Sequence, residues 1–174
     1  DGKIWAGEVG LARLGPDGAS KITMITSDGD SRSSPWLTPG RYLPFAHVAT
    51  GPNDERAIFG LAPITIAPGQ DQSFTATLQR RTVAITVHDA SGQPLADRRV
   101  VPQSLDHPEL AFEWRYGKRT DAAGRVVFDP APVGRLRIMA FPPTQKFGRT
   151  YVQPEVLLGE IATTATELAA RWPK

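Results

Sequence analysis

The sequence predicts an all-β chain that folds as two tandem β-sandwich modules, residues 1–79 and residues 82–172. Three observations lead to this prediction: alternating apolar residues, turn-forming residues between them, and an internal repeat. Gly and Pro each occur 16 times, which favours many turns over long helices. Hydrophobic residues make up 40% of the 174 residues, which is enough to build packed cores.

The predicted strands are short runs in which apolar residues occupy every second position. Val83, Ile85 and Val87 alternate with smaller or polar residues, which puts three β-branched side chains on one face of a strand. The same alternation occurs in residues 135–140 and 73–78. Turn-forming residues separate the runs, at 16–18, 52–54, 89–92 and 121–124. Residues 162–172 could form a helix, but we expect a strand there followed by a short tail.

An internal repeat runs through the chain, with an offset of 90 residues at its upstream and downstream landmarks. Residues 2–6 match 92–96, and residues 64–78 match 156–168, with turns expected at Pro68-Gly69 and at Gly159. Between these landmarks, Thr26 precedes Gly40 by 14 positions, and Thr120 precedes Gly134 by 14 positions. Three landmarks in the same order indicate a duplication.

The boundary between the repeats is short, because only residues 79–82 separate the last strand of one from the first strand of the other. We therefore expect a restricted mutual orientation of the modules. The first repeat begins inside the turn that matches residues 92–94, so a counterpart of strand 83–89 is missing from the sequence. We expect an upstream segment or a neighbouring subunit to supply it, the latter by head-to-tail self-assembly. The alternative is that residues 3–8 cover this edge.

Three segments of the second repeat resemble the carboxypeptidase regulatory-like domain, a prealbumin-like or Ig-like β-sandwich. They are residues 83–96, residues 120–128, which carry the pattern T-D-x-x-G, and residues 133–138. The resemblance covers most of residues 82–170, and residues 37–42 carry a degenerate version in the first repeat. It implies a module that accompanies an enzyme, a transporter barrel or a string of surface modules, and it brings no catalytic residues. Its glycines, Gly92 and Gly124, are expected at turns with positive φ.

Composition excludes several classes of protein. The net charge of +2 and the scattered basic clusters are unlike a nucleic-acid-binding surface. The chain has no cysteine and no long apolar run, so disulfides, thiolate metal sites and transmembrane segments are not expected. It starts at Asp1 without Met, which we interpret as a processed or excised part of an exported protein. The excess of Arg over Lys, with abundant Ala, Pro and Gly, is typical of GC-rich bacteria. We expect the protein to lie outside the bacterial cell, at its surface or in the periplasm.

No motif in the sequence specifies a reaction, a metal or a cofactor. The three histidines, His47, His88 and His107, lack the spacing H-E-x-x-H, and no G-x-S-x-G elbow occurs. Residues 28–31 could offer oxygen ligands to Ca²⁺, but a solvated hairpin explains them better. We therefore predict no catalytic residues and no enzyme activity.

The most unusual segment is residues 104–119, in which Phe112, Trp114 and Tyr116 alternate with Glu113 and Arg115. Such an aromatic row could stack on sugar rings, or it could simply face a sandwich core. The sequence thus leaves two functions open. The first is a structural or interaction module pair, a spacer, stalk or assembly unit that contacts a protein partner or the rest of its own parent chain. The alternative is a carbohydrate-binding accessory module for a polysaccharide.

Overall fold

The computed structural model describes residues 7–15, 18–28, 31–33, 37–49, 56–69, 78–110, 117–141, 146–147, 150–151 and 155–173. Over these residues the chain is built from β-strands joined by turns, with one short 3-10 turn, η1 (Pro108–Leu110). The prediction of an all-β chain is confirmed.

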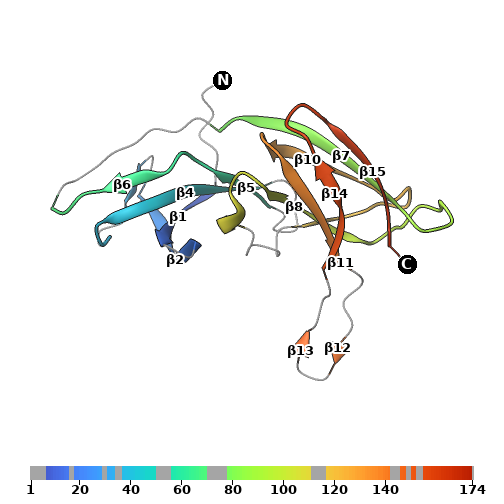
Figure 1. Cartoon of the computed structure of the whole chain (residues 1–174), viewed down its shortest axis with the longest axis horizontal. Helices are drawn as coiled ribbons and strands as arrows, with labels where there is room; N and C mark the ends of the chain where they lie inside the picture. Colours follow the sequence, from blue (N-terminus) through green and yellow to red (C-terminus); the bar gives the residue numbers. More distant parts are fainter. Residues whose placement is uncertain are drawn as a thin grey trace.

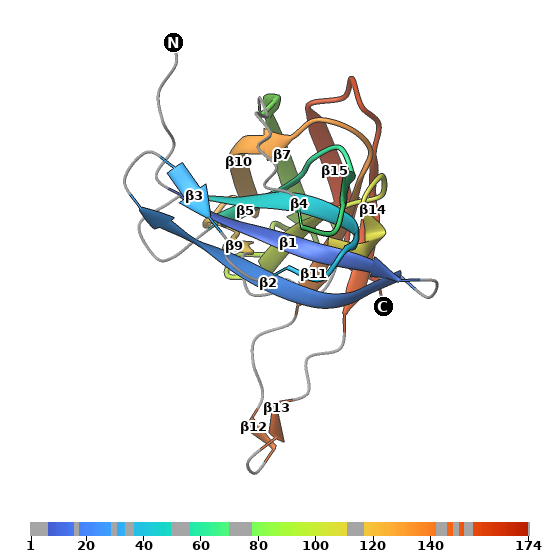
Figure 2. The same ribbon diagram turned by 90° about the vertical axis from the view of Figure 1, so that its left-hand side faces the viewer.

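The first strands form one antiparallel sheet, which we call the N-terminal sheet. It contains β1 (Gly7–Gly15), β2 (Gly18–Asp28), β3 (Ser31–Ser33), β4 (Gly40–Ala49), β5 (Arg56–Gly60) and β6 (Ile64–Ile66). The strand order is β3-β2-β1-β4-β5, and β6 pairs with the start of β4. Figure 2 shows this sheet in front of the later strands.

Both faces of β4 are buried, so apolar side chains pack on each side of the N-terminal sheet. Leu43 and Phe45 point to one face, where they form a cluster with Ala12. Ala46 and Val48 point to the other face and form a second cluster together with strand β5. A sheet that is buried on both faces is flanked by a layer on each side.

The later strands form a two-layer sandwich, which we call the C-terminal sandwich (Figure 1). One layer has the order β10-β7-β15, from β7 (Arg80–His88), β10 (Arg125–Pro132) and β15 (Glu167–Arg171). The other has the order β14-β11-β8-β9, from β8 (Arg99–Ser104), β9 (Lys118–Arg119), β11 (Leu136–Phe141) and β14 (Val156–Ile161). Strand β15 pairs with β7 in parallel, and the other ladders are antiparallel. Between β11 and β14, β12 (Lys146–Phe147) and β13 (Thr150–Tyr151) form a small separate hairpin.

The core of the C-terminal sandwich consists of residues predicted from the alternation. Val83, Ile85 and Val87 of β7 are fully buried and face Ile138 and Leu136 of β11 across the two layers. Burial of each such side chain contributes about 1.5–3 kcal/mol to the free energy of folding. The strands predicted at 82–88 and 135–140 are thus confirmed, as is a strand rather than a helix before residue 172.

One predicted turn is wrong. Gly159 lies inside β14, at a register shift between β11 and β14, with a φ of 153°. The turn comes later, at Thr163 and Thr164. A bulge and a turn both favour glycine, so the residue type alone does not distinguish them.

The sandwich expected for residues 1–79 is not decided by the described strands, which all belong to the single N-terminal sheet. The strand expected at 73–78 lies outside the described residues, apart from Leu78. A self-contained first module, and the domain boundary at 79–82, therefore stay predictions.

Candidate functional site: the junction between the two halves

The aromatic row predicted as a binding surface cannot be placed. Phe112, Glu113, Trp114, Arg115 and Tyr116 all lie outside the described residues. The residues that flank them are buried, however. Leu110 is 6% exposed and packs on the N-terminal sheet, and Gly117 lies against β8, where a Cβ would come within 2.6 Å of Val101 Cγ2. The carbohydrate-binding hypothesis stays a prediction.

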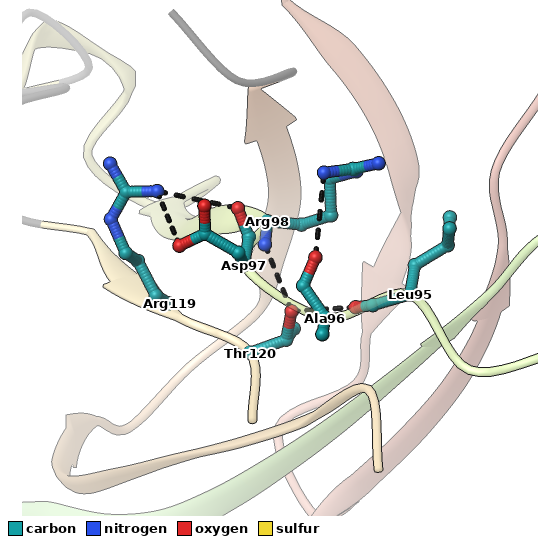
Figure 3. Close-up of polar contacts among 6 residues, drawn as sticks. All are labelled: Leu95, Ala96, Asp97, Arg98, Arg119 and Thr120. Carbon is teal, nitrogen blue, oxygen red and sulfur yellow. Dashed lines mark hydrogen bonds and ion pairs between the residues drawn. The ribbon is translucent and has the colours of Figure 1, made fainter. Parts of the chain in front are cut away.

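The T-D-x-x-G pattern begins with Thr120, whose side chain has a structural role. Its Oγ1 donates a hydrogen bond to Leu95 O (2.6 Å) and accepts one from Arg98 N (3.0 Å), as Figure 3 shows. The backbones of Thr120 and Arg98 also bond, from Thr120 N to Arg98 O (3.0 Å). Thr120 is 5% exposed, so these bonds satisfy a buried hydroxyl and hold the segment between β7 and β8 in place.

Charged residues surround this threonine at the surface. Arg119 Nη1 lies 2.7 Å from Asp97 Oδ1, and the guanidinium of Arg98 lies over the ring of Trp172, 5.6 Å from its centroid. Asp97 has a φ of 58°, a conformation that Asp tolerates better than most residues. Both partners of the ion pair are more than half exposed, so it contributes little stability. The group in Figure 3 is explained by local structure alone.

Two aspartates cap equivalent turns at one end of the sandwich. Asp89 Oδ1 accepts hydrogen bonds from the backbone N–H groups of Ser91 and Gln93, both at 2.8 Å. Asp121 Oδ1 does the same for Ala123 and Arg125, both at 2.9 Å. The hydroxyl of Ser91 also donates to Asp89 Oδ1 (2.7 Å), and this bond, first among several, lowers the pKa of Asp89 below its ordinary value. These bonds explain the two D-x-x-G patterns as turn geometry, because Gly92 and Gly124 have φ values of 86° and 68°.

The opposite end of the sandwich is organised by Arg81, just after the connection to the N-terminal sheet. Its guanidinium donates hydrogen bonds to five backbone carbonyl oxygens, those of Pro132, Gly134, Ala162, Thr163 and Ala165. One side chain thereby joins the β10–β11 turn to the β14–β15 turn. The sequence showed Arg81 only as part of a small basic cluster, because its partners are 51 to 84 residues away.

Residues 105–110, which we call the junction loop, leave this same end of the sandwich. Leu105 N donates to Arg135 O (2.9 Å), and the Asp106 carboxylate accepts from Arg135 N (3.0 Å) and Arg135 Nε (3.2 Å). The backbone N–H of Arg135 is the main cause that lowers the pKa of Asp106. Gly134 has a φ of 112°, and a Cβ there would overlap the Asp106 carboxylate. Ser104 Oγ accepts a hydrogen bond from His107 N (3.1 Å), which completes the anchoring.

The far end of the junction loop packs on the N-terminal sheet. Leu110 joins Leu43 and Phe45 in one apolar cluster. The His107 ring lies so close over Gly60 of β5 that a Cβ at position 60 would overlap it. Strand β5 also lies against β10, and η1 lies beside β2. The structure thus brings together Gly60, His107 and Leu110, none of which the sequence singled out as a junction.

The side chains of the junction loop pack against the N-terminal sheet and hydrogen-bond to the C-terminal sandwich. Within the described ranges, no group of three or more metal-ligating side chains gathers. No described helix is long and apolar enough to cross a membrane.

Comparison with known proteins gives no family. No family model matches the chain, and no curated protein matches it either. The resemblance to carboxypeptidase regulatory-like domains therefore stays a prediction. Among solved structures, the chain is similar to the major pilin subunit BcpA of Bacillus cereus, with a TM-score of 0.35 and 12% identity over 97% of this chain and 59% of that one. It is also similar to a C-terminal fragment of the pilus adhesin SpaC from Lactobacillus rhamnosus GG, with a TM-score of 0.26 and 11% identity over 95% of this chain and 87% of that one. Both likenesses are distant, and this chain spans about 59% of the length of the pilin subunit.

Proposed function

We propose that the chain is a non-catalytic structural or interaction unit of an exported bacterial protein. It would hold its two halves in one fixed relation and act as a spacer, stalk or assembly unit outside the cell. The observation that carries this proposal is the junction loop, which is anchored in the C-terminal sandwich by Asp106 and packs Leu110 into the N-terminal sheet. A spacer requires such a junction, because a flexible connection would not hold the two halves at a fixed distance from each other.

The chain connection supports the same function. Leu78 packs on the face of the N-terminal sheet opposite to the junction loop, in the cluster of Ala46 and Val48. Strand β7 starts at Arg80, so Gln79 alone separates it from Leu78. Contacts on both faces of the sheet and a connection this short restrict bending between the halves.

The partner proposed for this unit is another protein or the rest of its own parent chain. No cofactor enters the proposal. A location outside a bacterial cell, at its surface or in the periplasm, is part of the same proposal.

Distances between two spin labels, measured by double electron–electron resonance, test the proposed rigidity directly. The chain has no cysteine, so a pair introduced as Thr65→Cys and Ala122→Cys carries the only two labels. We expect a single narrow distance distribution between these exposed positions on the two halves. The matched control pair, Ala122→Cys and Ala162→Cys, lies within the C-terminal sandwich. A broad distribution for the first pair beside a narrow one for the control would rule out a rigid spacer.

The second candidate function, carbohydrate binding, rests on the alternation of Phe112, Trp114 and Tyr116 with Glu113 and Arg115. Retention of the intact chain on immobilised polysaccharides tests it. If it holds, the variant with Trp114→Ala and Tyr116→Ala passes through a column that retains the unchanged chain. Equal retention of both chains, or no retention of either, removes this function.

A further inference from the structure

The N-terminal sheet repeats one layer of the C-terminal sandwich. That layer has the strand order β14-β11-β8-β9, and the N-terminal sheet contains the order β6-β4-β1-β2. The matched strands follow each other in the same order along the chain, and β1 precedes β8 by the 90-residue offset of the repeat. The shared strand order therefore adds support for the duplication.

The match extends to which face of the layer is the core face. In the sandwich, Val100 of β8 pairs with Ala140 of β11, and both are buried between the two layers. At the offset of 90, Val100 corresponds to Gly10, which pairs with Phe45 of β4. The face of the N-terminal sheet that carries Phe45 is thus the counterpart of the sandwich's core face.

The two core faces are covered differently. In the sandwich, the layer of β10, β7 and β15 supplies the covering side chains, among them Val83, Ile85 and Phe128. On the Phe45 face of the N-terminal sheet, Leu110 packs into the apolar cluster and the His107 ring lies over Gly60, and both side chains come from the junction loop. The junction loop thus contributes side chains on the face where, in the sandwich, the second layer contributes them.

We propose that the C-terminal sandwich serves as the second layer of the N-terminal sheet, so that the sheet depends on the sandwich for its fold but the sandwich does not depend on the sheet. The composition of the two cores supports this direction. The sandwich core contains no residue from before Val83 among those described, whereas the cluster around Phe45 contains Leu110. The dependence runs one way because, among the described residues, the cluster around Phe45 contains a residue from the other half and the sandwich core does not.

Two glycines make room for aromatic rings on this face of the sheet, one for Phe45 of the sheet itself and one for His107 of the junction loop. A Cβ at Gly10 would overlap the Phe45 ring, and a Cβ at Gly60 would overlap the His107 ring. Gly10 and Gly60 are the residues paired with Phe45 on its two neighbouring strands. Because neither glycine has a side chain, the Phe45 ring fits over Gly10 and the His107 ring fits over Gly60. At Gly60 the surface is therefore shaped to accept the His107 ring of the junction loop.

Hydrogen exchange on the full chain, read by mass spectrometry of peptides, tests this dependence. In Leu110→Ala, we expect amides of β1 and β4 to exchange about tenfold or more faster, while β7 and β10 keep their rates. Gly60→Ala, which inserts a methyl group against the His107 ring, provides a second route to the same result. Leu157→Ala is the matched control, because Leu157 is 54% exposed and lies on β14, away from the junction.

The reciprocal variant tests the direction. Val126→Ala weakens the sandwich core, and we expect it to accelerate exchange in both halves. Unchanged rates in β1 and β4 for Leu110→Ala and Gly60→Ala, or acceleration by Val126→Ala confined to the sandwich, would overturn the proposal. Because these rates report on folding and the spin-label distances on orientation, the failure of one proposal is distinguishable from the failure of the other.

Discussion

The carboxylate of Asp106 holds Arg135 by two hydrogen bonds, one from its backbone N–H at 3.0 Å and one from Nε at 3.2 Å. This pair joins the start of the junction loop to the β10–β11 turn. Both side chains are more than one-third exposed, so water screens the attraction between them. The hydrogen bond from the Arg135 backbone fixes the position of the junction loop. The bond from Nε pairs the negative charge of Asp106 with the positive charge of Arg135.

Asp106→Asn is expected to lower the free energy of unfolding by less than about 1 kcal/mol at neutral pH. The folded-state pKa of Asp106 is lowered, so its contribution is present above the ordinary aspartate pKa and is lost as pH falls through the folded-state value. Melting temperatures of the variant and the unchanged chain, measured against pH, should therefore converge in acid. Glu160→Gln, in an exposed pair with Arg137, serves as the control. A difference that stays constant down to the lowest pH would contradict this assignment.

Arg81→Lys is expected to lower the free energy of unfolding by about 1–3 kcal/mol, although it keeps the positive charge. An ammonium group has three donors at one point, and it cannot reach carbonyl oxygens as far apart as those of Pro132 and Ala165. Urea unfolding measures the loss. Arg125→Lys, at an exposed position of β10, is the matched control and should be nearly neutral. Equal midpoints for the two variants would show that the carbonyl bonds of Arg81 add no stability.

Thr120→Val is expected to cost about 1–3 kcal/mol of stability, because it leaves Leu95 O and Arg98 N without their hydrogen-bond partner in a buried site. Valine has nearly the same shape, so the loss isolates the hydroxyl from the packing. Thr120→Ser keeps the hydroxyl and should retain most of the stability. Thermal unfolding of both variants measures the difference. Equal losses of stability for Thr120→Ser and Thr120→Val would contradict the role of the hydroxyl.

Gly92→Ala and Gly124→Ala separate backbone strain from steric overlap. Both glycines have positive φ, so alanine at either position costs about 1 kcal/mol of strain. Around Gly92 a Cβ would meet nothing within 4 Å, whereas at Gly124 it would lie 2.5 Å from Val87 O and 2.9 Å from Leu95 N. Gly124→Ala should therefore be the more destabilising by about 1 kcal/mol or more. Chemical denaturation of both variants checks the order, and equal losses would contradict it.

The features that the sequence predicted correctly are those determined by neighbouring residues. Val83, Ile85 and Val87 define β7 by alternation, and the patterns around Asp89 and Asp121 define turns whose hydrogen bonds span two to four residues. The parallel pairing of β15 with β7 was not predicted, because it joins residues more than 80 positions apart. The same holds for the carbonyl partners of Arg81.

The junction was only partly accessible from the sequence. Residues 104–119 are unusual in composition, and the short connection at 79–82 indicated a restricted orientation. The close approach of the junction loop to β5 depends on Gly60, which looks from the sequence like an ordinary strand glycine. Its role becomes visible only when the His107 ring is placed over it.

The parallel pairing of β7 and β15 has a mechanical consequence. Strand β7 begins at Arg80, next to the N-terminal sheet, and β15 runs in the same direction to Arg171, opposite His88. A pull on Arg80 and Arg171 in opposite directions is therefore directed along the strands, and it acts on all hydrogen bonds between them at once. Bonds that share a force in this way resist it better than bonds opened one after another, so tension between these two points would be opposed by the whole β7–β15 ladder.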